Sequence, residues 1–270
     1  GSTHADSLTG GNVANDELEF FQGLAHNDTI DGGSGYDRAD YNLSYAAVTV
    51  VLGGAASGTA TGADVGVDTL ISIESVRGSA FNDTLTGSDS AAFESFEGRE
   101  GNDQIDGQGG VDRVDYQTSK AGVTVNLAGG TASDGYGGTD TLTNIEDVRG
   151  SRDFNDSIVG SDGDNKLEGL GGNDTLEGGG GNDTLLGGTG ADTAVFSGNF
   201  ADYTIVQDAN NGQYTVTDSV GGRDGVDLVT SIEYFRFADV NRPAGGLTVD
   251  PKGTYLATSA NDLASAATTV

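Results

Sequence analysis

The feature of the sequence that most constrains its fold is a nonapeptide that repeats head to tail from Gly160 to Val195. The four copies read GSDGDNKLE, GLGGNDTLE, GGGGNDTLL and GGTGADTAV. Glycine opens each copy, Asp or Asn holds the sixth place, and Leu or Ala holds the eighth. Tandem copies in phase indicate a repeat architecture, in which each unit packs against its neighbours because it cannot form a core alone.

The order of residues within a copy predicts its path. Glycine adopts positive φ values without steric penalty, so the Gly-rich first six residues can turn. The last three residues must then be extended, and their central side chain points to one face. We therefore expect an all-β, flattened solenoid whose interior is lined by the eighth residue of each copy, namely Leu167, Leu176, Leu185 and Ala194.

If two nonapeptides make one coil, the acidic residues at the sixth place stack along the edges of the solenoid. Asp174 then lies over Asp192 and Asn165 over Asp183, while Asp156 precedes Asp174 by the same interval. Stacked carboxylates repel one another unless a cation lies between them. Asp carboxylates and backbone carbonyls suit Ca²⁺ better than Mg²⁺. With no Cys and only two His, the chain offers little to zinc or copper.

The composition narrows the partners and the conditions of folding. The chain has 42 acidic and 12 basic residues and a formal net charge of −30, which disfavours nucleic acid and anionic membranes and favours divalent cations. No apolar run approaches the roughly 20 residues of a membrane span, so we expect no membrane insertion. Low hydrophobicity with high net charge is also typical of disorder. We therefore expect the repeats to be largely disordered until metal binding supplies folding free energy.

The nonapeptides recur in three blocks, separated by two spacers that resemble each other. Asp37 matches Asp112 and Val48 matches Val123, both 75 residues apart (112 minus 37). Each spacer carries two β-rich runs with alternating apolar residues, which predict longer coils of the same right-handed helix; the alternative is a separate small β domain per spacer. The predicted division is 3–40, 78–115 and 150–196 for the blocks, 41–77 and 116–149 for the spacers, 197–240 for a β-rich cap with a hairpin signal, and 241–270 for a tail.

Blocks, spacers and tail together resemble the C-terminal region of secreted RTX (repeats-in-toxin) proteins, which carry hemolysin-type calcium-binding repeats. The resemblance implies a right-handed parallel β-roll with several bound Ca²⁺ ions, closed by the C-terminal cap. It also implies type I secretion from a Gram-negative bacterium, with an uncleaved signal that the secretion machinery reads at the C-terminus, here Leu256 to Val270. Such a module is disordered at the low calcium of the cell interior and folds outside the cell.

By the same resemblance, calcium lies between turns one coil apart and is held by sixth-place carboxylates and carbonyls of the Gly-rich stretch. One site would use Gly169, Gly171 and Asp174 together with Gly188, Gly190 and Asp192. The matching sixth place is held in other units by Asp16, Asp28, Asp37, Asp83, Asp103, Asp112, Asp156 and Asp183. The sequence departs from the family pattern at His26, where Gly is expected, and at Asn165, where Asp is expected. Sites that touch these two positions should be weaker or absent.

The sequence gives no sign of catalysis. It has no paired-His zinc motif, no G-x-S-x-G elbow and no phosphate-binding Gly-Lys loop, so we expect no enzymatic activity. Two functions remain: a calcium-driven folding and secretion module, or an adhesin, surface-layer or carbohydrate-binding module attached to an upstream domain. Glycan binding or calcium-dependent self-assembly would favour the second. Four tyrosines could form a sugar-stacking strip, although ordinary packing explains them better: Tyr36, Tyr41, Tyr116 and Tyr136.

Overall fold

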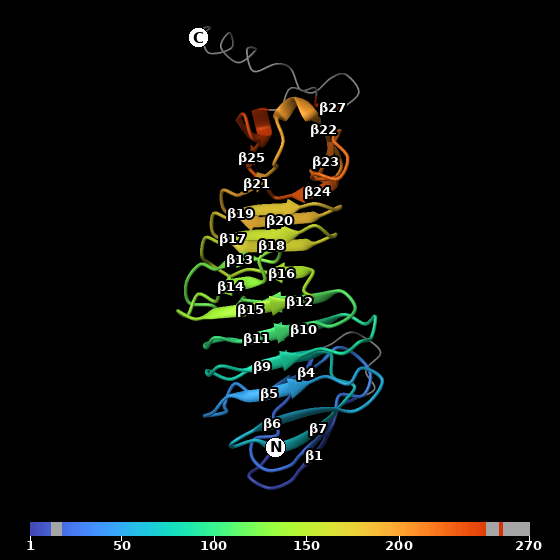
Figure 1. Ribbon diagram of the computed structural model, residues 1–270, viewed down its shortest axis with the longest axis vertical. Helices are drawn as coiled ribbons and strands as arrows, with labels where there is room; N and C mark the ends of the chain where they lie inside the picture. Colours follow the sequence, from blue (N-terminus) through green and yellow to red (C-terminus); the bar gives the residue numbers. More distant parts are fainter. Residues whose placement is uncertain (12–17, 247–253, 256–270) are drawn as a thin grey trace. The chain divides into compact units, whose positions relative to one another are not determined.

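The computed structural model describes residues 1–11, 18–246 and 254–255. They form β-strands and two short 3-10 helices, which confirms the all-β prediction. The chain divides into two compact units, Gly1–Arg149 and Gly150–Val270, each built of two sheets whose strands follow one another as rungs (Figure 1). Asp16 and Leu256 to Val270 lie outside the described residues. Within the described ranges, no helix is long and apolar enough to cross a membrane.

In the second unit the nonapeptides stack at an interval of 18 residues, and all their strand pairs are parallel. Consecutive nonapeptides enter opposite sheets, which confirms that two of them make one coil. One sheet holds β17 (Ser157–Ser161), β19 (Thr175–Gly179) and β21 (Thr193–Val195), and the other holds β18 (Lys166–Gly171) and β20 (Thr184–Thr189).

The interior of this stack is a single file of aliphatic side chains along each sheet. Leu167 pairs with Leu185 and Leu176 pairs with Ala194, and all four are 0% exposed, as predicted. Each buried Leu contributes about 1.5–3 kcal/mol of transfer free energy. With one such residue for nine ordered residues, the core is thin, and the turns must contribute stability of their own.

Antiparallel strands close the second unit beyond the repeats, in agreement with the predicted cap and its hairpin. β24 (Val226–Thr230) pairs parallel to β20 and antiparallel to β23 (Tyr214–Asp218), which forms a hairpin with β22 (Tyr203–Gln207). Aromatic rings pack inside, with the centroids of Phe196 and Phe237 5.4 Å apart. The remaining elements are η1 (Phe200–Asp202), β25 (Tyr234–Arg236), β26 (Asn241–Pro243), η2 (Ala244–Gly246) and β27 (Thr254–Tyr255).

The first unit has the same two-sheet plan with less regular coils. One sheet has the order β1 (Ser7–Thr9), β3 (Thr29–Asp31), β7 (Gly66–Ile71), β6 (Gly58–Gly62), β5 (Val48–Val51), β9 (Thr84–Thr86), β11 (Gln104–Asp106), β15 (Thr139–Thr143), β14 (Thr131–Ser133) and β13 (Thr124–Asn126). The other has the order β2 (Glu19–Phe21), β4 (Asp37–Asp40), β8 (Ser75–Arg77), β10 (Glu94–Glu97), β12 (Asp112–Asp115) and β16 (Asp147–Arg149).

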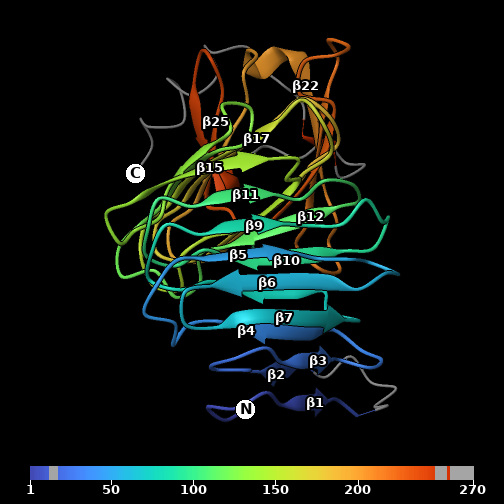
Figure 2. The same cartoon turned by 60° about the horizontal axis from the view of Figure 1, so that its bottom comes forward.

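The spacers differ from both expectations. Their outer strands join the same sheets as the repeats, because β7 pairs parallel to β3 and β5 pairs parallel to β9, so the spacer is not a separate domain. It is not a simple long coil either, since β6 runs antiparallel between β5 and β7 (Figure 2). The second spacer repeats the device with β14. The sequence gives little sign of strand β6, because Ala60 is its one buried apolar side chain.

Candidate metal centre

The sixth-place side chains form a ladder along the edges of the coils. The Oδ1 atom of Asp192 accepts a hydrogen bond from the backbone N–H of Asp174 at 2.8 Å, and Asp174 accepts one from Asp156 in the same way at 2.8 Å. On the other edge, Asp183 accepts from the N–H of Asn165 at 2.8 Å. The predicted stacking of these residues is therefore present, with one carboxylate oxygen engaged between each pair of turns.

Acidic residues outside the nonapeptides extend this ladder, and the sequence analysis missed them. The N–H of Asp37 donates to Glu74 Oε2 at 3.0 Å, and Asp28 donates to Asp68 Oδ1 at 2.9 Å. The further pairs are Asp112 to Glu146, Asp192 to Glu233, Asp103 to Asp140 and Asp183 to Asp227. Two sequence patterns mark these residues. The glutamates end the triplet S-I-E or N-I-E, and the aspartates precede a β-rich run, as in V-D-T-L.

The second oxygen of many of these carboxylates is buried without a hydrogen-bond partner among the described residues. Asp174, Asp183 and Asp192 are at most 1% exposed, yet each has an orphaned Oδ2. A buried oxygen with a charge and no partner is costly, by several kcal/mol. The aspartates with such an atom are Asp28, Asp37 (both oxygens), Asp103, Asp112, Asp134, Asp174, Asp183 and Asp192.

The carboxylate folds back against the first glycine of its own turn. A Cβ atom at Gly169 would lie 2.3 Å from Asp174 Oδ2, and one at Gly178 would lie 1.9 Å from Asp183 Oδ2. No side chain fits at such a distance, so glycine is required here for close approach.

The four glycines predicted to share one site do not stack on one another. The residues stacked on Gly188 and Gly190 are Leu170 and Gly172, because a Cβ at Gly188 would lie 2.1 Å from the Leu170 carbonyl oxygen and one at Gly190 would lie 1.6 Å from that of Gly172. Gly169 lies instead against Asp174, and Gly171 lies near the Arg152 carbonyl and Thr189. The predicted set combined the first and third places of one turn with the second and fourth places of the turn one coil on, whereas second place stacks on second and fourth on fourth.

These second and fourth places have left-handed backbone. Leu170 has φ 73° and Gly172 has φ 123°, and Gly188 and Gly190 have φ 107° and 141°. His26, which departs from the family pattern, keeps the same conformation with φ 78°. A left-handed non-Gly residue costs roughly 1–2 kcal/mol, so the turn geometry is maintained at a price in local strain.

Burial raises the pKa of four aspartates of the ladder, and neighbouring carboxylates raise it further. The pKa of Asp174 and that of Asp183 rise to about 7, and that of Asp103 to about 8. The pKa of Asp192 also rises because of burial, with the charge of Glu233 adding to it. In the absence of a cation, Asp103, Asp174 and Asp183 therefore bind protons near neutral pH.

The donor set suits a hard cation that accepts main-chain ligands. Among the described residues, no three His, Cys, Asp or Glu side chains gather as a cage for a metal. The turns instead offer orphaned carboxylate oxygens next to closely spaced backbone carbonyls, and Ca²⁺ accepts this mixture of oxygen ligands. The residues present therefore fit calcium.

The tyrosines do not form a sugar-stacking strip. Tyr41 and Tyr116 are 3% and 2% exposed, and their hydroxyls donate to Asp68 Oδ2 at 3.1 Å and Asp140 Oδ2 at 3.0 Å. These two tyrosines pack in the spacers, where their hydroxyls donate hydrogen bonds to acidic residues of the ladder.

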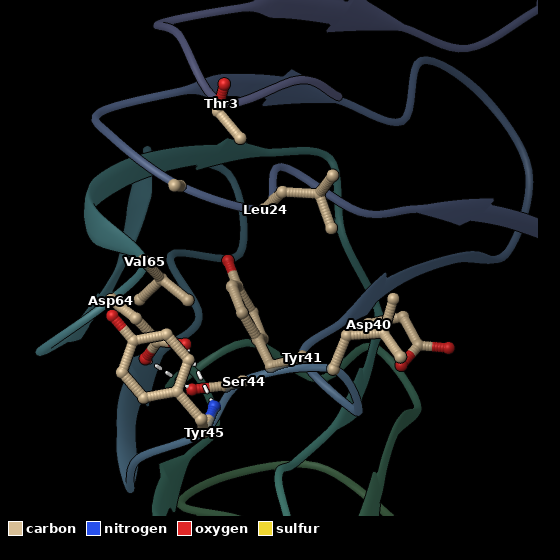
Figure 3. Close-up of a pocket in the computed structure, with 10 residues that line it drawn as sticks. Thr3, Leu24, Asp40, Tyr41, Ser44, Tyr45, Asp64 and Val65 are labelled. Carbon is tan, nitrogen blue, oxygen red and sulfur yellow. Dashed lines mark hydrogen bonds between the residues drawn. The ribbon is translucent and has the colours of Figure 1, made fainter.

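A pocket of about 270 Å³ lies in the first unit beside Tyr41, Leu24 and Val65 (Figure 3). Its polar groups are engaged with one another, because Asp64 accepts from the Ser44 hydroxyl at 2.6 Å and from the Tyr45 N–H at 2.9 Å. The Tyr45 ring is 74% exposed at its rim. The pocket therefore has an aromatic edge but few polar groups left to bind a ligand.

Comparison with known proteins agrees with this geometry. The family model for the RTX calcium-binding nonapeptide repeat (4 copies) matches residues 20–39, 72–91, 92–117, 152–185 and 159–194. A search of curated proteins finds no match. The matched segments contain the stacked turns and their orphaned carboxylates, so geometry and family agree on a calcium-binding module. These segments of the chain are RTX calcium-binding nonapeptide repeats.

Proposed function

We propose that this RTX module is disordered at low calcium and folds into its β-roll as Ca²⁺ binds between successive turns. One observation carries the proposal: buried carboxylate oxygens without partners recur at turn after turn, as at Asp174 and Asp192. Each destabilises the metal-free fold, and a cation between the turns removes that cost. Folding and calcium binding are then one process.

The proposed ligands are carboxylates and carbonyls of turns one coil apart. For the pair of turns that contains Asp174 and Asp192, the carbonyls are those of Leu170, Gly172 and Gly188, together with Gly190, since these second and fourth places stack. The other turns with orphaned oxygens would use Asp28, Asp37, Asp103, Asp112 and Asp183 in the same role. Asp16 stays a predicted ligand outside the described residues.

We place this folding outside the cell. The resemblance to RTX proteins supports export through the type I machinery and a C-terminal signal, and a net charge of −30 supports an extended chain when calcium is scarce. In this role the module assists the secretion and folding of its parent protein and carries no enzymatic activity of its own.

A titration of the full chain tests the proposal. In chelator we expect a coil-like circular dichroism spectrum and a large hydrodynamic radius, and added Ca²⁺ should produce β structure and compaction together. Mg²⁺ at the same concentration is the control and should be much less effective, because it demands near-ideal octahedral geometry. A chain that is equally compact and heat-resistant in chelator would contradict the proposal.

The alternative role is a carbohydrate-binding or self-assembling surface. One observation favours it, the exposed Tyr45 and Leu43 at the rim of the pocket in the first unit, which are 74% and 65% exposed. Glycan-array binding that is lost in Tyr45→Ala would support this role, whereas a calcium-loaded monomer without glycan affinity would support the first.

A further inference from the structure

The turns fall into two classes according to the residue at their second place. We infer that a serine there closes the turn to calcium by binding the carboxylate itself, whereas a residue with left-handed backbone leaves the carboxylate open to the ion. The inference rests on the proposed function, because it assigns which turns of the same ladder hold metal.

Two nonapeptides show the closed arrangement, which we name the serine clasp. The N–H of Ser79 donates to Asp83 Oδ2 at 2.6 Å, and its hydroxyl donates to Asp83 Oδ1 at 2.8 Å. Ser151 makes the same pair of bonds to Asp156, both at 2.7 Å. Both serines are 0% exposed, so water does not compete for these bonds.

The clasp recurs elsewhere with other acceptors. Ser88 donates through N–H and hydroxyl to Glu94 at 2.8 and 2.6 Å, and Ser197 donates to Asp224 at 2.8 and 2.6 Å. In the turn of Asn165 the acceptor is an amide oxygen, which receives the N–H of Ser161 at 2.7 Å and its hydroxyl at 3.2 Å. The same geometry thus forms on Asp, Glu and Asn, within turns of different length.

The open turns have the opposite arrangement at the second place. There the backbone is left-handed, from φ 66° at Gln108 to φ 107° at Gly188. The sixth-place Asp of every one of these turns has an orphaned, buried oxygen. The second-place residues and their partners are Leu24 with Asp28, Gly33 with Asp37, Arg99 with Asp103, Gln108 with Asp112, Leu170 with Asp174, Gly179 with Asp183, and Gly188 with Asp192.

The two classes do not overlap in the part of the chain that the structure describes. No clasped carboxylate is among those with an orphaned oxygen, and no clasping serine is among the residues with left-handed backbone. A clasp directs two donor hydrogens at the carboxylate, and donors repel a cation while they satisfy the oxygens. Hydrogen bonds therefore replace calcium in these turns.

This assignment removes two residues from the predicted calcium ligands, namely Asp83 and Asp156. It also explains why Asn165 is compatible with the ladder, since a clasped turn needs no charge at the sixth place. Ser79 and Ser151 follow the first glycines of the second and third blocks, so each of these blocks begins with a turn that is closed without metal.

Exchange of second-place residues tests the inference in the full chain, with bound Ca²⁺ counted by equilibrium dialysis and isothermal titration calorimetry. Ser151→Gly frees Asp156 and permits left-handed backbone, so it should bind about one more ion per chain than the wild type. Leu170→Ser should clasp Asp174 and bind about one fewer. The controls are Ser157→Gly in β17 of the same repeat and Leu186→Ser at a half-buried position of β20, and both should keep the wild-type count.

The outcomes separate this inference from the proposed function. If wild-type protein binds calcium and folds with it, yet neither Ser151→Gly nor Leu170→Ser changes the number of ions, the clasp does not control metal binding. If Ser151→Gly fails to fold, the pair Leu170→Ser and Leu186→Ser still decides, since both replace a half-buried leucine of the third block by serine and only the first places it at the second place of an open turn. A wild-type chain that takes up no calcium overturns the proposed function, and this inference with it.

Discussion

The third block and the first spacer close the same kind of acidic edge in different ways. In the third block, Asp174 engages one oxygen with the neighbouring turn and leaves the other buried without a partner. In the spacer, Asp68 engages Oδ1 with Asp28 and Oδ2 with the buried hydroxyl of Tyr41. In the spacer, the Tyr41 hydroxyl satisfies the oxygen that we propose a cation satisfies in the block. The acidic edge thus has carboxylates that depend on metal and carboxylates that do not.

The first unit also neutralises its outer surface with arginines. Arg77 lies 2.9 Å from Glu97 and Arg38 lies 3.2 Å from Asp40, and all four belong to adjacent strands of one sheet, β4, β8 and β10. Partly exposed pairs of this kind contribute little singly, up to about 1 kcal/mol, but as a network they reduce repulsion between rungs. The first unit should therefore depend less on calcium than the third block does.

Removal of calcium should have the largest effect and should separate the two regions. With chelator, amide hydrogen exchange in β18 and β20 should accelerate by about 100-fold or more, because a site at 100 times its Kd stabilises by about 2.7 kcal/mol. Exchange in β5, β6 and β7 should accelerate less. Hydrogen-exchange mass spectrometry measures both regions in one sample, and equal acceleration would end the distinction.

Acidification should act in opposite directions with and without calcium. The raised pKa values mean that the metal-free fold binds more protons than the unfolded chain between about pH 4 and pH 7, so its stability falls as pH rises through this window. In chelator, lowering the pH from 8 to 6 should therefore promote compaction. In the presence of calcium, the same change in pH should release the ion, because protons compete with it for the carboxylates. For each ligand carboxyl group, a pH one unit below its pKa should raise the calcium concentration at the folding midpoint about tenfold.

Loss of one carboxylate should weaken calcium-induced folding without changing the spacers. Asp174→Asn keeps the shape of the side chain and removes its charge, and we expect a calcium midpoint at least about tenfold higher, which corresponds to 1.4 kcal/mol. Asp162→Asn, at an exposed position of the same block, is the matched control and should leave the midpoint within error. Circular dichroism during calcium titration reads both variants.

The smallest effect should come from the spacer tyrosine. Tyr116→Phe leaves Asp140 Oδ2 without its donor, and we expect a loss of about 1 kcal/mol, at the low end for a buried acceptor. The cost is limited because burial raises the pKa of Asp140 to about 6, so the group can take up a proton. Thermal unfolding should show the same decrease at partly saturating calcium, where the chain is folded, and at saturating calcium. A decrease that saturating calcium removes would mean that the spacer turn also binds the ion.

The sequence predicted those parts of the molecule that depend on local phase. Because the nonapeptides follow one another in phase, the interval of 18 residues and the burial of three leucines could be predicted from them, namely Leu167, Leu176 and Leu185. The antiparallel β6 could not be predicted in this way, because its place depends on pairing with β5 and β7 and its sequence carries little apolar signal.

For the candidate site, the sequence predicted which residue types stack but not which places of successive turns lie over one another. The stacking of the sixth-place aspartates was predicted because carboxylates at equal spacing lie one above the other, and their role as ligands stays a prediction. The left-handed backbone of Leu170, whose carbonyl we propose as a ligand, was not predicted because a leucine gives no sign that it will adopt this conformation. The serine clasp was missed for a related reason, since Ser151 and Asp156 meet only after the turn has formed.

The alternation of nonapeptides between two sheets limits how such a gene can change in length. Excision of 18 residues removes a whole coil and leaves every later strand on its original side, with its aliphatic residue still inside. Excision of nine would transfer every later strand to the opposite sheet and misalign the cap. Recombination between repeats is therefore tolerated in even steps, and lineages of this chain should differ by pairs of nonapeptides.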